Sequence, residues 1–224
     1  MTRPYVLSSV AMSLDGYIDD TTPDRLLLSN DEDFDRVDDV RASVDAILVG
    51  AGTVRADNPR LLVRSDDRRK ARLADGKTES PIKAVIAGAT ALDPTAKFFT
   101  TGDIDKVVYT PARHYTAHQS ALSSLAHVVD AGEPVDPGAI LADLAARNVD
   151  RLMIEGGSSV HTQFLAAGLV DELHVVIAPF FVGDTDAPRF VNPARFPQDA
   201  AHRMRLVETL PIGDVIFARY RPSA

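Results

Sequence analysis

Short runs rich in Val and Ile most constrain the fold of this chain. They have the composition of strands buried on both faces of a sheet, and they are "PYVLSSVA" (4–11), "DAILVG" (45–50), "IKAVIAG" (82–88), "KVVYT" (106–110), "HVVDA" (127–131), "RLMIE" (151–155) and "ELHVVIAPFFV" (172–182). Stretches with helical features separate several of these runs. This alternation predicts an α/β fold with a mostly parallel central sheet and helices on both of its faces.

Three stretches predict helices from their caps and apolar spacing: 29–44, 136–149 and 158–168. In the first, Ser29 or Asn30 is the expected N-cap, and acidic residues fill the first turn, where the helix dipole favours them. In the second, Asp136 is the expected cap and Pro137 takes the first helical position. In each of the three helices, we expect the apolar residues to lie on one inward face.

Two regions depart from the alternation of strands and helices. Residues 64–81, "RSDDRRKARLADGKTESP", are polar and aperiodic, so we expect a long exposed loop. Its basic run, 68–72, is interpreted as solvated, with contact to a cofactor phosphate as the alternative. Residues 204–221 contain two strand-like runs around "PIGD" and predict an antiparallel C-terminal hairpin.

Composition limits the classes of protein that fit. A chain of 224 residues is expected to form a single domain, 1–224, and no apolar run approaches the ~20 residues of a membrane helix. With no cysteine, disulfides and thiolate chemistry are excluded, and together with the strand-like opening this predicts a cytoplasmic protein. A net charge of −8 disfavours nucleic acid and membrane as partners. Any anionic ligand must be held by a few local cations.

The "VGAG" sequence at 49–52 has two interpretations. Gly50 and Gly52 match the first two glycines of a dinucleotide-binding fingerprint, but Arg55 occupies the position of the third small residue. The alternative is a tight strand-to-helix turn that needs glycine.

A second glycine pair follows the run at 151–155. Gly156 and Gly157 come after Glu155, and a helix is expected to begin at Ser158 or Ser159. Exposed N–H groups and the helix dipole at such a turn suit a pyrophosphate. A capped helix after a glycine turn is the alternative.

Arg41 falls on the expected apolar face of the first helix. It lies seven residues after Phe34, four after Val37 and three before Val44. An unpaired buried charge is costly, so the guanidinium must either reach the edge of the helix or meet an anion. Either a ligand phosphate or an internal carboxylate would serve.

Asp57 and Glu155 are expected just beyond strand ends, where open α/β sheets bind ligands. Asp57 could instead cap a turn. His114 and His118 are four residues apart, but Tyr115 replaces the Glu of a zinc-protease motif, so we expect no metal site.

Taken together, these residues resemble the reductase of riboflavin biosynthesis, whose fold is related to dihydrofolate reductase. The matching stretches are "PYVLSSVAMSLDG", "RVDDVRASVDAILVGAGTVRADNPRLLVR", "MIEGGSSV", "FLAAGLVDELHVVIAP" and "IGDV". They span nearly the whole chain, without a preceding deaminase-like zinc motif. The resemblance implies a dihydrofolate reductase-like fold, a homodimer, and reduction of the ribosyl group of an aminopyrimidine ribose 5′-phosphate with NADPH, or with NADH as the alternative.

The resemblance also implies residue roles. Asp57 would be the acid/base residue near C1′ and would contact the cofactor. The substrate would be bound by Arg41 and Arg64 at its phosphate, by Glu155 at its pyrimidine, and by Leu61 and Arg25. The cofactor would be bound by Thr53, Gly156, Gly157, Ser158 and Ser159, with Ala11 and Leu27 on the nicotinamide side.

Three questions stay open at the level of sequence. Ser9 stands where fusion-type family members carry Lys, so the pyrimidine could be the deaminated or the undeaminated form. Ala87 and Gly88 replace residues near the adenosine 2′-phosphate of NADPH, which leaves NADH possible. Two alternative functions remain: a related pterin or dihydrofolate reductase, and a non-catalytic nucleotide-binding module.

Overall fold

A computed structural model describes residues 2–22, 24 and 26–223. The chain forms two compact units, one of residues 1–5 and 38–153 and the other of residues 6–37 and 154–224. Each is described in turn. In the described part of the chain, every helix is too short or too polar to span a membrane.

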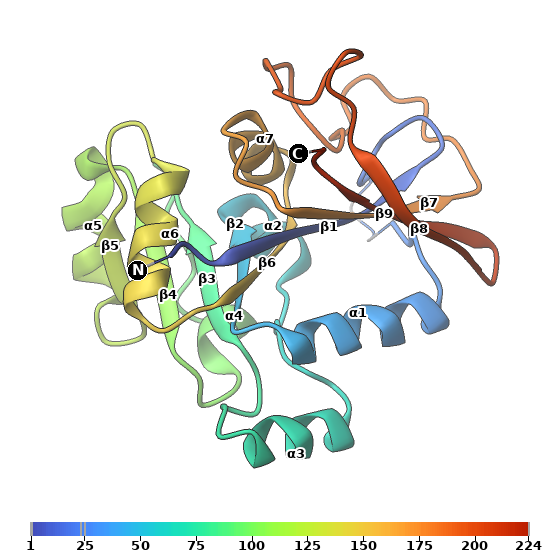
Figure 1. Ribbon diagram of the computed structural model, residues 1–224. Helices are drawn as coiled ribbons and strands as arrows, with labels where there is room; N and C mark the ends of the chain where they lie inside the picture. The colour runs from blue at the N-terminus through green and yellow to red at the C-terminus, as the bar shows by residue number, and fades with distance from the viewer. Residues whose placement is uncertain (1, 23, 25, 224) are drawn as a thin grey trace. The chain divides into compact units, whose positions relative to one another are not determined.

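The first unit is a parallel α/β layer (Figure 1). Its hydrogen-bonded strand order is β5-β4-β3-β2-β6, and its strands are β2 (Ala46–Gly50), β3 (Ile82–Ile86), β4 (Lys106–Thr110), β5 (His127–Asp130) and the start of β6 (Arg151–Gly156). Its helices are α2 (Ala51–Asp57), α3 (Asp66–Ala74), α4 (Lys97–Thr100), α5 (Ala112–Leu122) and α6 (Pro137–Ala146). Strands β2 to β4 form the core of this unit, because they bury Ile47, Val49, Val85, Val107 and Val108 completely.

The second unit ends in an antiparallel hairpin. Its strand order is β6-β1-β7-β9-β8, with β1 (Tyr5–Ser13), β7 (Glu172–Ala178), β8 (Arg205–Ile212) and β9 (Val215–Arg221). Strand β1 pairs with β7 in parallel, whereas β9 pairs with both β7 and β8 in antiparallel fashion. The predicted C-terminal hairpin and the predicted mostly parallel α/β class are both confirmed.

Two helices complete the description: α1 (Asp31–Ser43), which begins in the second unit and ends in the first, and α7 (Ser158–Ala166) in the second unit. The predicted caps are confirmed, since Asn30 Oδ1 accepts from the Asp33 N–H at 3.1 Å and Asp136 Oδ1 accepts from the Gly138 N–H at 2.8 Å. The inward residues of α6 and α7 are buried as predicted: Ile140, Leu141, Leu144, Val160, Phe164 and Leu165.

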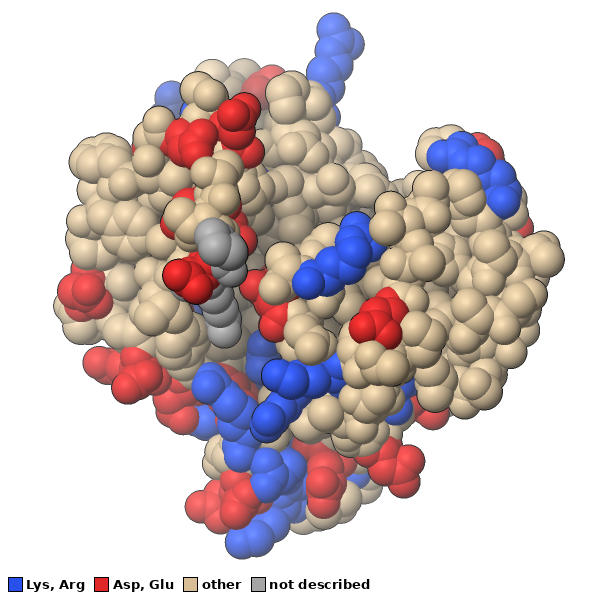
Figure 2. Space-filling model, turned by 180° about the vertical axis from the view of Figure 1, so that it is seen from behind, with Lys and Arg blue, Asp and Glu red and all other residues tan. Residues whose placement is uncertain are grey.

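The prediction of a long exposed loop at 64–81 is wrong, because residues 66–74 form α3. Ser65 caps this helix, and Asp66 and Asp67 lie in its first turn, where they complement the helix dipole. The basic run 68–72 is therefore helical. Figure 2 shows basic and acidic side chains mixed at the lower end of the molecule, where α3 lies.

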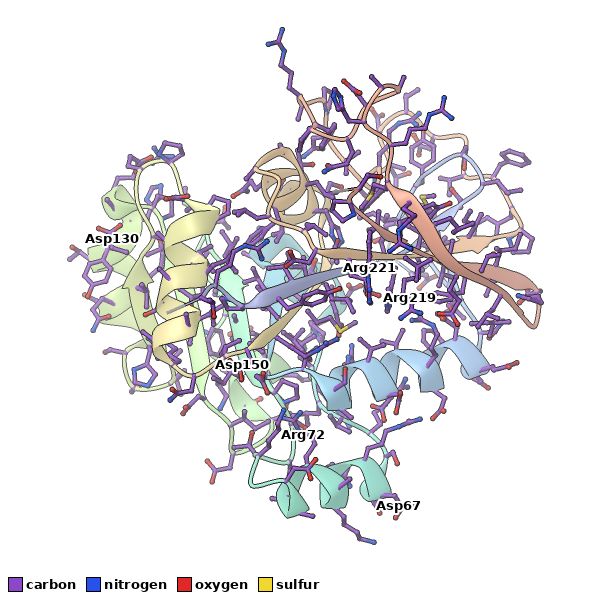
Figure 3. The ribbon with its side chains drawn as sticks, viewed as in Figure 1. Asp67, Arg72, Asp130, Asp150, Arg219 and Arg221 are labelled. Carbon is purple, nitrogen blue, oxygen red and sulfur yellow. The ribbon has the colours of Figure 1, made fainter. Side chains whose placement is uncertain are left out.

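Arg72 explains why this polar helix folds against the first unit. Its guanidinium donates to the carbonyls of Thr78 (2.8 Å), Ala42 (2.8 Å) and Val44 (2.7 Å), and the residue is only 4% exposed. In Figure 3, Arg72 lies on the inner side of α3, while Asp67 points away from it. A basic residue thus replaces the apolar stripe by which helices are usually detected in a sequence.

The inward face of α1 is less apolar than predicted. Asp33 and Asp38 are each 2% exposed, whereas Phe34, Val37 and Arg41 are half-buried. Each buried carboxylate is compensated: Asp33 Oδ1 accepts from Arg36 Nε at 2.6 Å, and Asp38 accepts several hydrogen bonds described below.

Candidate active site

Helix α2 presents two of the predicted site residues in the first unit. It begins directly after β2, and Thr53 and Asp57 lie four residues apart on one side of it, while Ala51 and Val54 are buried on the other. Asp57 is exposed and is the last residue of α2, so the expectation that it falls just beyond a strand end is wrong. The intervening helix carries the carboxylate away from the strand and places it on the same helical face as Thr53.

The glycines before Thr53 are not required by the backbone. Gly50 has an extended conformation (φ −83°, ψ 153°) that any residue adopts. A Cβ added to Gly52 would meet no atom within 4 Å. The turn therefore needs no glycine at position 52, where the space for a side chain is open, and the Gly50 backbone angles do not demand one.

The segment after Asp57 has an unusual backbone. Asn58 and Leu61 adopt positive φ angles of 43° and 50°, and Leu61 is only 2% exposed. Such conformations are uncommon outside glycine and cluster at functional sites. Asn tolerates this conformation, but the buried Leu61 is held in one that a leucine side chain does not favour.

Two predicted phosphate ligands lie at the C-terminal end of this segment. Arg41 Nη1 donates to the Leu62 carbonyl at 3.3 Å. Arg64 is held through its backbone, whose N–H donates to Asp38 Oδ1 at 2.6 Å, while its side chain is 58% exposed. The structure therefore brings Arg41, Leu61 and Arg64 together within the first unit.

Asp38 is a site residue that the sequence analysis missed. It accepts from the N–H groups of Arg64 and Ser65 (3.0 Å) and from Arg68 Nη1 at 3.1 Å. Burial raises the pKa of the Asp38 carboxyl, but these hydrogen bonds and the Arg68 charge outweigh it and hold that pKa below its ordinary value. Six acidic residues occupy α1, and nothing in their spacing distinguishes Asp38.

The second glycine pair forms the turn between β6 and α7 in the second unit. Gly156 and Gly157 have φ angles of 146° and 32°, and no side chain caps the helix at Gly157. The Val160 and His161 N–H groups donate to the Gly157 carbonyl at 3.0 and 3.2 Å, so the N–H groups of Ser158 and Ser159 are the donors that a pyrophosphate would use at this turn. Glu155 lies inside β6, half-buried, so the expectation that it falls beyond the strand is wrong by one or two residues.

The serines of this turn are already engaged. Ser158 Oγ donates to the Arg189 carbonyl, and Ser159 Oγ accepts from Asn192 Nδ2 at 3.4 Å. Because both hydroxyls have partners in the 189–192 segment, the backbone is the better anion ligand at this turn.

The remaining predicted residues belong to the second unit. Ala11 is half-buried on β1 and packs against the apolar cluster of Val176, Ile212, Val215 and Phe217. Leu27 exposes 62% of its surface, which is high for a large apolar residue. Arg25 lies outside the described residues.

The two histidines of "HYTAH" have separate surroundings. His118 Nε2 is 2.8 Å from the Gly88 carbonyl oxygen, and His114 Nε2 accepts from Arg113 Nε at 3.1 Å. Among the residues that the structure describes, no group of three His, Cys, Asp or Glu side chains could hold a metal ion.

Known proteins resemble this chain over nearly its full length. A family model described as the RibD C-terminal domain matches residues 4–218. The 2,5-diamino-6-ribosylamino-4(3H)-pyrimidinone 5′-phosphate reductases of Archaeoglobus fulgidus and Methanothermobacter thermautotrophicus are each 34% identical over 220 residues. These alignments cover 97% of this chain and 99% and 98% of the two relatives. A crystal structure of a pyrimidine reductase-like protein from Corynebacterium diphtheriae matches with a TM-score of 0.81 at 25% identity, covering 99% of this chain and 92% of that one.

Proposed function

Because the chain belongs to the RibD C-terminal domain family, we propose that it is a reductase of riboflavin biosynthesis that uses NADPH. Its substrate is 2,5-diamino-6-ribosylamino-4(3H)-pyrimidinone 5′-phosphate, whose ribosyl group it reduces to ribityl. The names of two relatives with near-complete coverage support this choice of the undeaminated pyrimidine. The structural observation that carries it is the hydrogen bond from Arg41 to the Leu62 carbonyl, which places Arg41 beside the segment that leads from Asp57 to Arg64.

The substrate phosphate is assigned to Arg41 and Arg64. The protein carries a net charge of −8, so an anionic substrate needs local cations rather than a general attraction. The largely exposed Arg64 side chain can close on a phosphate as a bidentate donor. Asp38 holds the backbone at Arg64 in place and so orients this arginine.

The cofactor is assigned to Thr53 and to the turn from Gly156 to Ser159. The donor chemistry of this turn fits a pyrophosphate, and the apolar surroundings of Ala11 and the exposed Leu27 fit a nicotinamide ring. When bound, the nicotinamide supplies the hydride. NADPH is proposed over NADH from the family resemblance.

Asp57 is assigned the proton chemistry. The ribosylamine must open to an imine before C1′ can accept a hydride, and a carboxylate favours the iminium cation and moves the proton that ring opening requires. The exposed position of Asp57 at the end of α2 leaves its carboxylate accessible to a ligand. Glu155 is assigned to the pyrimidine, where a carboxylate accepts hydrogen bonds from amino groups.

The test is to follow absorbance of NADPH, and separately of NADH, with each of three substrates: the undeaminated pyrimidinone phosphate, its deaminated form, and dihydrofolate. We expect oxidation of NADPH with the pyrimidinone phosphate. Turnover of dihydrofolate alone would identify a folate-type reductase, and binding of NADPH without turnover of any substrate would identify a non-catalytic module.

Three expectations beyond the reaction stay predictions: a single domain, a homodimer and a cytoplasmic location. Exposed apolar residues on the terminal hairpin, Leu206, Leu210 and Ile216, give a dimer a surface to bury. Sedimentation equilibrium decides between monomer and dimer.

A further inference from the structure

Asn58, the residue directly after Asp57, is held on two sides. Its backbone is left-handed (φ 43°, ψ 54°), and its N–H donates to the Val54 carbonyl of α2 at 3.2 Å. Its side-chain Oδ1 accepts from the Lys97 N–H at 2.7 Å. Asn is one of the few residues that enter this conformation readily.

The acceptor on Asn58 supplies a need of helix α4. This helix begins at Lys97, and its N-cap residue, Ala96, has no side-chain oxygen to accept from the first N–H groups. Asn58, 39 residues earlier in the chain, provides that oxygen.

The other end of α4 is anchored by a buried lysine. Lys83 Nζ on β3 donates to the Phe98 and Thr101 carbonyls at 3.2 and 2.6 Å. A cation at helix C-terminal carbonyls is favourable. Helix α4 is thus attached to the sheet at one end and to Asn58 at the other.

A second contact joins the same two segments. A Cβ added at Gly102, just after α4, would lie 2.8 Å from Leu62 Cδ2, so the Leu62 side chain packs directly against the Gly102 backbone. Residues 58–62 therefore rest on residues 97–102 at both of their ends.

We propose that Asn58 is a positioning residue for Asp57, acting through its hydrogen bond to the Lys97 N–H. Helix α4, anchored by Lys83, forms a fixed support, and Asn58 connects that support to the end of α2, where the acid/base carboxylate lies. This inference rests on the proposed function, since it assigns Asp57 the proton chemistry.

Two single variants remove the hydrogen bond from opposite sides. Asn58→Gly keeps the left-handed backbone and removes the acceptor. Lys97→Pro removes the donor, and proline is tolerated here because Lys97 is the first helical residue and Ala96 has a ψ of 146°. Lys97→Ala, which keeps the N–H, is the matched control.

We expect kcat to fall roughly 10- to 100-fold in both variants, because small misplacements of a catalytic group are costly. KM for substrate and for NADPH should change by no more than about threefold, and Lys97→Ala should resemble the wild type. The kcat of the double variant should be no lower than that of the more impaired single variant, because both substitutions remove the same interaction. Unchanged kcat in either variant, or additive losses, would overturn the proposal.

Amide hydrogen exchange provides a readout that does not depend on turnover. Peptides covering residues 51–62 should exchange faster in Asn58→Gly and Lys97→Pro than in the wild type or Lys97→Ala. Unchanged exchange overturns the proposal whatever the kinetics show. If the two variants exchange faster than the wild type but the wild type oxidises no NADPH with any pyrimidine, the proposed function fails. The structural role of Asn58 in supporting the turn then still stands.

Discussion

The Asp38 carboxylate accepts a hydrogen bond from the backbone N–H of Arg64 at 2.6 Å. A buried acid within α1 thereby fixes the backbone of an arginine whose side chain remains exposed. Because both oxygens of Asp38 accept, the segment that carries Arg64 is set before any ligand arrives.

Asp38→Asn should weaken substrate binding. An amide retains one acceptor oxygen and replaces the other with an NH₂ donor. One of the two backbone N–H groups would then face a donor instead of an acceptor. Loss of a charge-assisted hydrogen bond predicts a rise in KM for the phosphorylated substrate of about tenfold. The control is Asp39→Asn, whose side chain is 72% exposed. Equal KM values for the two variants in steady-state kinetics would contradict the role of Asp38.

Asp38 should also contribute to acid unfolding. Its pKa is lowered in the folded protein, so its stabilising contribution is full above the unfolded value of about 3.9 and is lost as the pH falls through the folded value. Urea unfolding between pH 6 and pH 2.5 measures this. The stability of Asp38→Asn should depend less on pH in this range than that of the wild type or of Asp39→Asn.

Lys83 should give a dependence of the same sign, but at alkaline pH. Burial, with a smaller effect of the Lys106 charge, lowers the pKa of Lys83 to about 8. Between pH 8 and about 10.4 the folded protein has released this proton and the unfolded chain still holds it, so stability rises with pH over that window. The free energy of unfolding of the wild type, measured against Lys83→Met, should therefore increase from pH 8 to 10. A difference in free energy of unfolding that does not change with pH would contradict the lowered pKa of Lys83. The control is Lys70→Met, at a lysine that is 77% exposed, which should show no such trend.

Asp57→Asn should abolish turnover and preserve binding. An amide cannot take up a proton, while its size and position are retained, so kcat should fall by about a hundredfold or more. NADPH affinity, measured by fluorescence titration, should stay within about twofold, since no interaction with the cofactor phosphates is removed. Asp67→Asn, on the outer side of α3, is the control (Figure 3). Near-normal turnover in Asp57→Asn would exclude this carboxylate as the proton-transfer group.

The two glycine motifs can be separated by matched alanine variants. Gly52→Ala should fold normally, since its Cβ meets no atom, and the KM for NADPH should change by less than about twofold if the pyrophosphate binds elsewhere. Gly157→Ala should raise that KM by about tenfold or more, because a φ of 32° is strained for alanine and the N–H groups at α7 would shift. The opposite ranking would move the pyrophosphate to Gly52.

The sequence by itself determined the strands, the terminal hairpin and the capped helices of this protein. Runs of Val and Ile, the "PIGD" turn and the caps at Asn30 and Asp136 act through neighbours a few residues away, and their physics is therefore local. The glycine turn before α7 could be located for the same reason.

Only the tertiary structure decided the features that join distant parts of the chain. Helix α3 is fixed by Arg72, which reaches carbonyls 28 and 30 residues away. Asp38 finds Arg64 across 26 residues, and Asn58 finds Lys97 across 39. Burial of Arg72 and Asp38 is favourable only because particular partners meet them, and the exposed Asn58 likewise depends on a distant N–H. Spacing along the sequence carries no record of these partners.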